Sequence, residues 1–285
     1  MEIRLSAFAD EASADLLQQI ETLNRERIPL IELRGVNGKN VAEFADEEAV
    51  RYREQLDAGG IEVWAIGSPL GKIGAREEFD RHLKKAEHIY RLANIFGTSR
   101  VRVFSFYTNA PERDEAEVFA RMRAMSELAK DYGVTLFHEN EKGIYGDLPV
   151  RNLKLLKNVA GLRCVFDPAN YVQCGADIEK ALDLLEDKID YYHIKDALYA
   201  GGEVVPAGKG EGRLSRMIGG ICKDTVLTLE PHLTVFDGYA KIDCTQLRHK
   251  YHYNSSKEAF AAAAQALREL LRENCYMETN GVWKK

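Results

Sequence analysis

The sequence lacks paired cysteine motifs, long apolar runs and an excess of basic residues. Its five cysteines include no C-x-x-C pair, and this odd number of separated thiols is typical of a reducing compartment, so we expect no disulfides. No stretch approaches the roughly 20 apolar residues of a membrane span, and the first residues, M-E-I-R-L-S-A-F, are typical of a strand rather than a signal peptide. These absences predict a cytoplasmic protein without a membrane partner.

Basic residues are in the minority, since 39 Lys and Arg face 45 Asp and Glu and the formal net charge is −6. Such a balance argues against a nucleic-acid partner, which needs a broad basic surface, and favours a small polar substrate. The 285 residues, 45% of them hydrophobic, can bury a substantial core. One α/β barrel of about 250 residues accounts for this length.

Strand-like and helix-like segments alternate along the chain. The expected strands cover residues 3–8, 30–33, 61–66, 100–106, 134–139, a short run ending at 167, 189–194 and 226–230. The expected helices cover residues 12–27, 41–58, 77–96, 114–132, 150–158, 178–185, 213–218 and 257–272. Eight such repeats predict a single (β/α)8 TIM barrel over residues 1–273 with a C-terminal tail, 274–285; an open doubly wound sheet is the alternative.

Four of the expected strands end in a side chain that can bind a metal. V-T-L-F-H-E-N ends with Glu139, R-C-V-F-D-P-A-N with Asp167, I-D-Y-Y-H-I-K-D with His193 and T-V-L-T-L-E-P-H with Glu230. The carboxyl ends of parallel barrel strands share one face, where barrel enzymes carry their active sites. We therefore expect the four side chains to converge on one metal ion; the alternative for any single carboxylate is a helix cap or a solvated charge.

Three carboxylates and one imidazole form a hard, mostly oxygen site. Such a site suits manganese, magnesium or cobalt and differs from the thiolate sites that bind zinc. Such an ion can polarise a ketose carbonyl and stabilise an enediolate after an adjacent carbon loses its proton. A carboxylate beside the metal can serve as the base, and two on opposite sides can pass the proton between positions of the sugar.

Other polar residues follow the same strand ends. Lys195 and His232 each lie two positions beyond a candidate ligand, so they point to the same side and are candidate substrate contacts or members of a salt bridge. Asp196 is placed to orient Lys195 or a ligating histidine. His138 has the opposite parity to Glu139 and is expected to pack between strand and helix.

Two loops and one strand end complete the candidate pocket. Lys72, in G-S-P-L-G-K, follows a strand and is placed to hold a substrate anion, although the loop is too short for a nucleotide-binding P-loop. Residues 207–213, A-G-K-G-E-G-R, occupy a position where barrels often bind phosphate, or form a flexible loop. Glu32 and Arg34 are placed to shape the pocket or to pair with neighbouring charges.

The ordered endings E-N, F-D-P-A-N, H-I-K-D and L-E-P-H resemble those of the xylose-isomerase-like TIM-barrel superfamily, which includes sugar phosphate isomerases and epimerases, ketose 3-epimerases, inosose dehydratases and endonuclease IV. The resemblance implies one divalent metal, manganese before magnesium, cobalt or zinc, bound by Glu139, Asp167, His193 and Glu230. It also implies that Glu139 and Glu230 form the acid/base pair.

The resemblance is incomplete around the substrate. Ketose 3-epimerases usually carry a histidine three residues after the metal aspartate and an arginine six residues after the metal histidine; here Asn170 and Tyr199 stand there, and Asn170 is the candidate substrate contact. Endonuclease IV needs a larger set of histidines, whereas only His138, His193 and His232 lie at expected strand ends. DNA repair is thus disfavoured.

We expect an isomerase or epimerase of a sugar, sugar phosphate or related keto-polyol. A dehydratase of an inosose-like keto-polyol is the alternative, and a barrel that binds sugar without catalysis is a third. Residues 234–256 are too long for a passive connection and form either a partial cover over the site or a contact in a homodimer.

Overall fold

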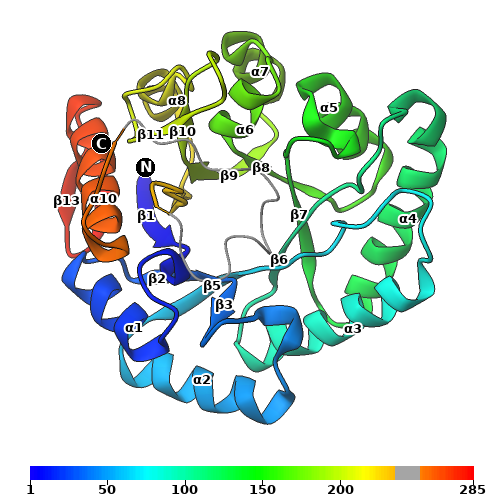
Figure 1. Cartoon of the computed structure of the whole chain (residues 1–285), viewed down its shortest axis with the longest axis horizontal. Helices are drawn as coiled ribbons and strands as arrows, with labels where there is room; N and C mark the ends of the chain where they lie inside the picture. Colours follow the sequence, from blue (N-terminus) through cyan, green and yellow to red (C-terminus); the bar gives the residue numbers. More distant parts are fainter. Residues whose placement is uncertain (235–250) are drawn as a thin grey trace.

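Eight parallel strands close into a ring in the computed structural model, which describes residues 1–234 and 251–285. The strands are β1 (Glu2–Ala7), β2 (Leu30–Leu33), β5 (Glu62–Gly67), β6 (Arg100–Val103), β7 (Thr135–Glu139), β8 (Arg163–Phe166), β9 (Ile189–Ile194) and β12 (Thr225–Leu229). Each pairs in parallel with the next, and β12 pairs with β1 to close the barrel, as Figure 1 shows. The predicted single (β/α)8 barrel is confirmed.

Helices surround the ring of strands (Figure 1). They are α1 (Leu16–Arg25), α2 (Asp46–Ala58), α3 (Asp80–Ile95), α4 (Pro111–Asp131), α5 (Pro149–Asn158), α6 (Pro168–Gln173), α7 (Ile178–Leu185), α8 (Leu214–Gly220) and α10 (Ser256–Glu273). Most agree with the expected ranges. The helix expected from residue 41 begins at Asp46 instead, because Val41–Glu43 form a separate 3-10 turn, η2.

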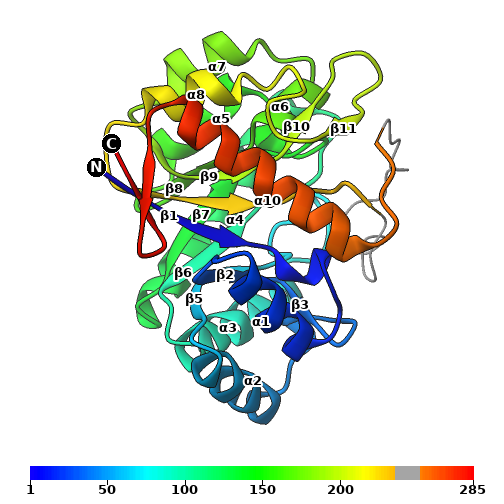
Figure 2. The ribbon, with the colours of Figure 1, turned by 90° about the vertical axis from the view of Figure 1, so that its left-hand side faces the viewer.

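Three short antiparallel hairpins and the helix α6 were not expected from the sequence. The hairpins are formed by β3 (Gly35–Val36) with β4 (Lys39–Asn40), β10 (Asp196–Ala197) with β11 (Val204–Val205), and β13 (Met277–Thr279) with β14 (Val282–Lys284). β14 also pairs with the first half of β1, so residues 274–285 are docked on the barrel. The two chain ends consequently lie side by side (Figure 2).

The apolar core has two layers. The outer layer lies between strands and helices, and the inner layer fills the barrel with side chains from five strands: Leu30, Phe137, Val165, Tyr191 and Val226. Because side chains alternate along a strand, a residue two positions after an inner-layer residue also faces inward, nearer the carboxyl end. The inner layer therefore forms the floor beneath Glu139, Asp167 and His193.

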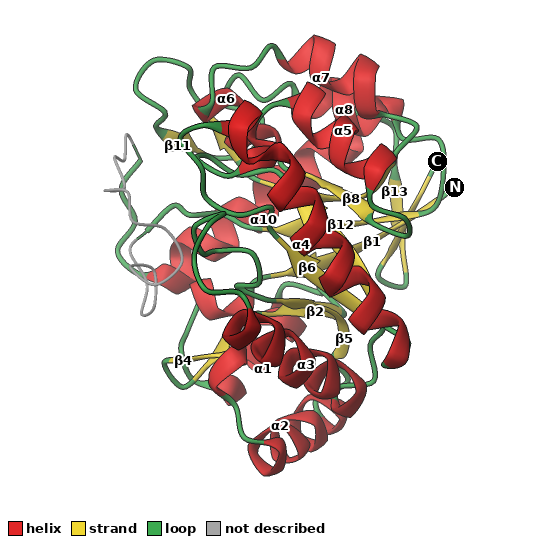
Figure 3. Ribbon diagram, turned by 90° about the vertical axis from the view of Figure 1, so that its right-hand side faces the viewer, coloured by secondary structure: helices red, strands yellow, loops and turns green. Residues whose placement is uncertain are grey.

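The side views in Figures 2 and 3 show the short hairpins β3–β4 and β10–β11 at the end of the barrel opposite the chain termini. That end carries the carboxyl ends of the strands. Residues 234–256 were expected to form a partial cover over the site or a contact in a homodimer. Most of this segment, 235–250, lies outside the described residues.

Two further expectations concern cysteines and membranes. The cysteines among the described residues, Cys164, Cys174, Cys222 and Cys275, are all free, while Cys244 lies outside that part of the chain. Within residues 1–234 and 251–285, no helix has the length and apolar character that a membrane span needs.

Candidate functional site

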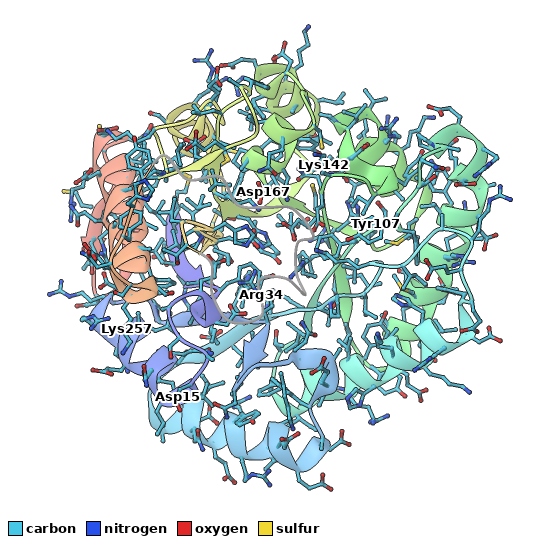
Figure 4. The ribbon with its side chains drawn as sticks, in the orientation of Figure 1. Asp15, Arg34, Tyr107, Lys142, Asp167 and Lys257 are labelled. Atoms are coloured by element: carbon cyan, nitrogen blue, oxygen red, sulfur yellow. The ribbon has the colours of Figure 1, made fainter. Side chains whose placement is uncertain are left out.

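The four candidate ligands converge at the carboxyl end of the barrel. Glu139 ends β7, Asp167 follows β8, His193 lies in β9 and Glu230 follows β12, and one ligand atom from each lies within 4.8 Å of the other three. All four side chains are buried. Figure 4 shows Asp167 directed towards the middle of the ring, on the opposite side from Arg34.

The donor atoms of this cluster fit a divalent metal ion. His193 Nδ1 lies 3.0 Å from Glu139 Oε1 and 3.5 Å from Glu230 Oε2. Among the described residues, Glu139 Oε2, Asp167 Oδ2 and His193 Nδ1 are buried without a well-directed hydrogen bond. Each of these atoms instead lies within 3.1 Å of a charged side chain, Glu139 Oε2 of Arg102, Asp167 Oδ2 of Lys195 and His193 Nδ1 of Glu139, so charge and not hydrogen bonding dominates the cluster. Three carboxylates and one imidazole suit a hard or borderline divalent ion.

His193 is oriented from the far side of its ring by Glu32. Glu32 Oε2 lies 3.1 Å from His193 Nε2, and the Tyr191 hydroxyl donates to Glu32 Oε1 over 3.1 Å. An ionised carboxylate only accepts, so Nε2 carries a hydrogen and Nδ1 is the atom left to face the ligand cluster. The structure thus places Glu32, which was expected to shape the substrate pocket or to pair with neighbouring charges, against the candidate ligand His193.

The close approach of these charged side chains shifts their pKa values. Burial alone would lower the pKa of His193, but the Glu139 and Glu32 carboxylates raise it well above its usual value. Burial raises the pKa of Asp167 to about 7, against the opposing influence of Lys195. A metal ion would have to displace protons from this site, as is usual for histidine and carboxylate ligands.

Arginines pair with both members of the predicted acid/base pair. Arg102 Nη1 lies 3.1 Å from Glu139 Oε2, and Arg34 Nη1 lies 3.1 Å from Glu230 Oε1. Burial would raise the pKa of Glu139, yet His193 and Arg102 hold it below its ordinary value. Burial would likewise raise the pKa of Glu230, yet Lys195 and His232 hold it well below. Both glutamates are therefore ionised and able to accept a proton.

Arg34 also joins the site to the segment after β1. Its guanidinium bonds both oxygens of Asp10 at 2.9 Å and Glu11 Oε1 at 3.1 Å. His232 Nε2 lies 3.4 Å from Glu11 Oε1 and 3.5 Å from Glu230 Oε1, beyond the end of β12; its contact with substrate stays a prediction. Burial raises the pKa of Glu11 to about 8, although Arg34 opposes the shift.

Asn170 lies beside the ligands, where its amide group is used within the protein. Asn170 Nδ2 donates to the backbone oxygen of Asn140 over 2.8 Å and to Glu139 Oε1 over 3.3 Å. Its backbone N–H donates to Asp167 Oδ1 over 2.8 Å. Asn170 thus orients two candidate ligands, and substrate contact by this residue stays a prediction.

Asp196 serves the glycine-rich loop rather than Lys195. Its carboxylate accepts hydrogen bonds of 2.9–3.0 Å from the backbone N–H groups of Ala197, Gly208, Gly210 and Gly212. Concave sets of N–H groups bind anions, and here the anion is the protein's own side chain. Three N–H groups of the candidate phosphate loop are therefore already engaged.

Lys72 and His138 lie next to the cluster but outside it. Lys72 Nζ is 2.8 Å from Glu141 Oε2 and 4.4 Å from the ring centre of Phe104. His138 is buried behind β7, with Nδ1 3.0 Å from Asn152 Oδ1 and Nε2 2.9 Å from Ser105 Oγ. This Ser–His–Asn set has no exposed surface, so it is a structural network and not a nucleophilic site.

Sequence reasoning missed Arg102, Asn140 and Tyr191. Arg102 did leave a signal, because it lies between two valines in the expected strand R-V-R-V, and a charged side chain that is buried in a strand needs a partner. Tyr191 left a weaker one, since it precedes His193 by two positions and so faces the same way.

Comparison with known proteins agrees with this geometry. Residues 29–232 match the family model described as xylose isomerase-like TIM barrel. The chain belongs to this family. A 3-dehydroshikimate dehydratase of Bacillus anthracis is 25% identical over 171 residues, which cover 58% of this chain and 61% of that relative.

Solved structures of other proteins share the barrel. The probable 3-DHS dehydratase AsbF of Bacillus anthracis superposes with a TM-score of 0.70 at 20% identity, over 94% of this chain and 99% of its own. An IOLI protein with a bound zinc atom superposes with a TM-score of 0.72 at 15% identity, over 95% of this chain and 99% of its own. D-psicose 3-epimerase superposes with a TM-score of 0.71 at 14% identity, over 93% of this chain and 97% of its own. At these identities the likeness establishes the fold.

Proposed function

We propose that the protein is a divalent-metal-dependent isomerase or epimerase of a sugar, a sugar phosphate or a related keto-polyol. The observation that carries this proposal is the position of Glu139 and Glu230, which approach His193 Nδ1 to 3.0 and 3.5 Å within one buried cluster. Two ionised carboxylates around one substrate position can remove a proton and return it elsewhere.

The proposed metal ligands are Glu139, Asp167, His193 and Glu230. When bound, a divalent ion supplies positive charge that polarises a substrate carbonyl and acidifies the neighbouring C–H. We favour manganese because the donors are mostly oxygen, with magnesium, cobalt or zinc as alternatives; a structural neighbour, the IOLI protein, carries zinc.

In the forward direction one glutamate removes the proton from the carbon beside the carbonyl, which leaves an enediolate. The other glutamate, or the same one after a small movement, delivers a proton to the opposite face or the adjacent carbon. His193 and Arg102 lower the pKa of Glu139, Lys195 and His232 lower that of Glu230, and the apolar floor limits water from below. Lys195 and His232 are proposed to contact the substrate oxygens, together with Asn170 beside the candidate ligands and Lys72 further out.

A dehydratase is the second candidate, and the 25% identity to 3-dehydroshikimate dehydratase favours it. Dehydration begins with the same proton abstraction, after which the enolate expels a hydroxyl group from the next carbon and an acid protonates the leaving oxygen. The same side chains serve both reactions, so the substrate decides between them. A barrel that only binds sugar is the third candidate.

The deciding experiment incubates the Mn2+-loaded protein with ketoses, sugar phosphates and keto-polyols, including inososes and 3-dehydroshikimate, in deuterated water. Deuterium uptake without other mass change supports the isomerase or epimerase, and loss of water supports the dehydratase. Glu139→Gln and Glu230→Gln should abolish exchange, whereas Glu54→Gln, at an exposed position of α2, should not. No exchange with any compound would favour the binding-only alternative.

We also propose a cytoplasmic location, on the free state of the described cysteines. Assembly as a homodimer is part of the same proposal, and sedimentation of the purified protein would test it.

A further inference from the structure

Lys195 occupies an unusual place for a lysine. It follows His193 by two residues and points inward, and only 5% of its surface is exposed. Its ammonium Nζ lies 3.0 Å from Asp167 Oδ2 and 3.2 Å from Glu230 Oε2. Among the described residues, both carboxylates within 4 Å of this ammonium are candidate metal ligands.

The two arginines of the site differ from Lys195 in this respect. Arg34 pairs with Asp10 and Glu11 as well as with a ligand, and Arg102 lies 3.9 Å from Glu32 as well as near a ligand. These arginines retain carboxylates outside the ligand set when a metal binds. The ammonium of Lys195 would lose both of the ion pairs described above.

A buried cluster of three carboxylates is unstable without cations, because desolvated like charges repel strongly. Lys195 supplies one positive charge between two of them, in the part of the site where a divalent ion would supply two. A flexible four-carbon stem lets an ammonium group change partners with little change in the backbone.

We propose that Lys195 is the resident counter-cation of the metal site: its ammonium group holds Asp167 and Glu230 together while the metal is absent and gives up these carboxylates when a divalent ion binds. The inference rests on the metal site of the proposed function. It implies an order of binding, because the ammonium group becomes available to substrate oxygens only after the metal has taken its place.

Charge competition gives this proposal an unusual signature. A residue that merely shapes a metal site lowers metal affinity when it is removed. Removing Lys195 should raise the affinity, because the metal no longer displaces an ammonium group or approaches a positive charge a few ångströms away.

The test compares Mn2+ dissociation constants, measured for every variant by competition with a chelating indicator at low salt and at the same fixed pH. Lys195→Met should bind Mn2+ at least about tenfold more tightly than the wild type. Lys195→Arg retains the charge, so its Mn2+ dissociation constant should stay within about threefold of the wild-type value. Lys209→Met makes the same change of net charge at an exposed position and should also stay within about threefold.

A second measurement uses the wild-type protein and does not depend on the folding of a variant. Reductive methylation, followed by peptide mass spectrometry, should modify Lys195 faster in the Mn2+-loaded protein than in the metal-free protein. Equal or slower modification overturns the proposal, as does equal or weaker Mn2+ binding by a folded Lys195→Met variant. Failure of the wild type to bind Mn2+ would instead overturn the metal site itself.

Discussion

Asn140 and Asp167 exchange two hydrogen bonds across neighbouring strand ends. Asn140 Nδ2 donates to the Asp167 backbone oxygen over 2.9 Å, and the Asp167 backbone N–H donates to Asn140 Oδ1 over 3.0 Å. The side-chain amide thus continues the β7–β8 pairing one step beyond the strands. This contact fixes the spacing of Glu139 and Asp167, the first two candidate ligands.

Replacing Asn140 with alanine should weaken both the fold and the metal site. The change leaves the buried N–H and C=O of Asp167 without these partners, which should cost about 3 kcal/mol in the free energy of unfolding. Urea unfolding of the metal-free protein would measure it. Asn158→Ala is the control, since the Asn158 amide donates to the Lys154 carbonyl at an exposed helix end and should change stability by about 0.5 kcal/mol or less. Equal losses in the two variants would contradict this role for Asn140.

Gly210→Ala should disrupt the loop that encloses Asp196. A Cβ at residue 210 would lie 2.3 Å from Asp196 Oδ1, so the carboxylate would have to leave its set of backbone N–H groups. We expect a loss of about 2–3 kcal/mol in the free energy of unfolding, from the broken hydrogen bonds of a buried charge. Gly220→Ala is the control, because its new Cβ would meet nothing within 4 Å and the helix α8 tolerates alanine there. Its free energy of unfolding, measured by thermal unfolding, should be unchanged or slightly raised.

The barrel and the convergence of the four candidate ligands were predictable because their signals are local. Alternating side chains and a polar residue at the strand end lie within a few positions of each other, as in T-L-F-H-E for Glu139. The contact between Glu32 and His193 joins residues 161 positions apart, and no local pattern specifies it. Asp196 was placed wrongly for the same reason, since its glycine partners lie 12–16 residues further along.

Two missed hairpins did have a local signal. Both β3–β4 and β13–β14 turn on an Asn-Gly pair with positive φ, 54° and 74° at Asn37 and Gly38 and 52° and 76° at Asn280 and Gly281. Asn-Gly is the strongest short signal of a two-residue hairpin turn. Their flanking strands are only two or three residues long, too short for an alternating pattern to be recognised.

His138 should make stability depend on pH. Burial lowers the pKa of this imidazole to about 4, whereas in the unfolded chain it is near 6.5. The unfolded chain therefore takes up a proton that the folded protein rejects, so the stabilisation is complete above pH 6.5 and is lost as pH falls through about 4. Between these values the slope should be about 1.4 kcal/mol per pH unit.

The measurement is the difference in unfolding free energy between the wild type and His138→Phe from pH 4 to pH 8. The lost contacts with Ser105 and Asn152 add an offset that does not vary with pH. A difference that stays constant below pH 6.5 would show that His138 is protonated in the folded protein.

Glu32→Gln tests the orientation of His193. The variant preserves the shape of a fully buried side chain but removes the charge that faces His193 Nε2 at 3.1 Å. A less basic imidazole with a less defined orientation binds a metal more weakly, so the Mn2+ dissociation constant should rise about 10- to 100-fold while the folded state persists. Glu62→Gln makes the same change of net charge at an exposed ion pair with Arg4 and should leave the constant unchanged. If Glu32→Gln and Glu62→Gln bound Mn2+ equally well, His193 would not depend on Glu32 for its role as a ligand.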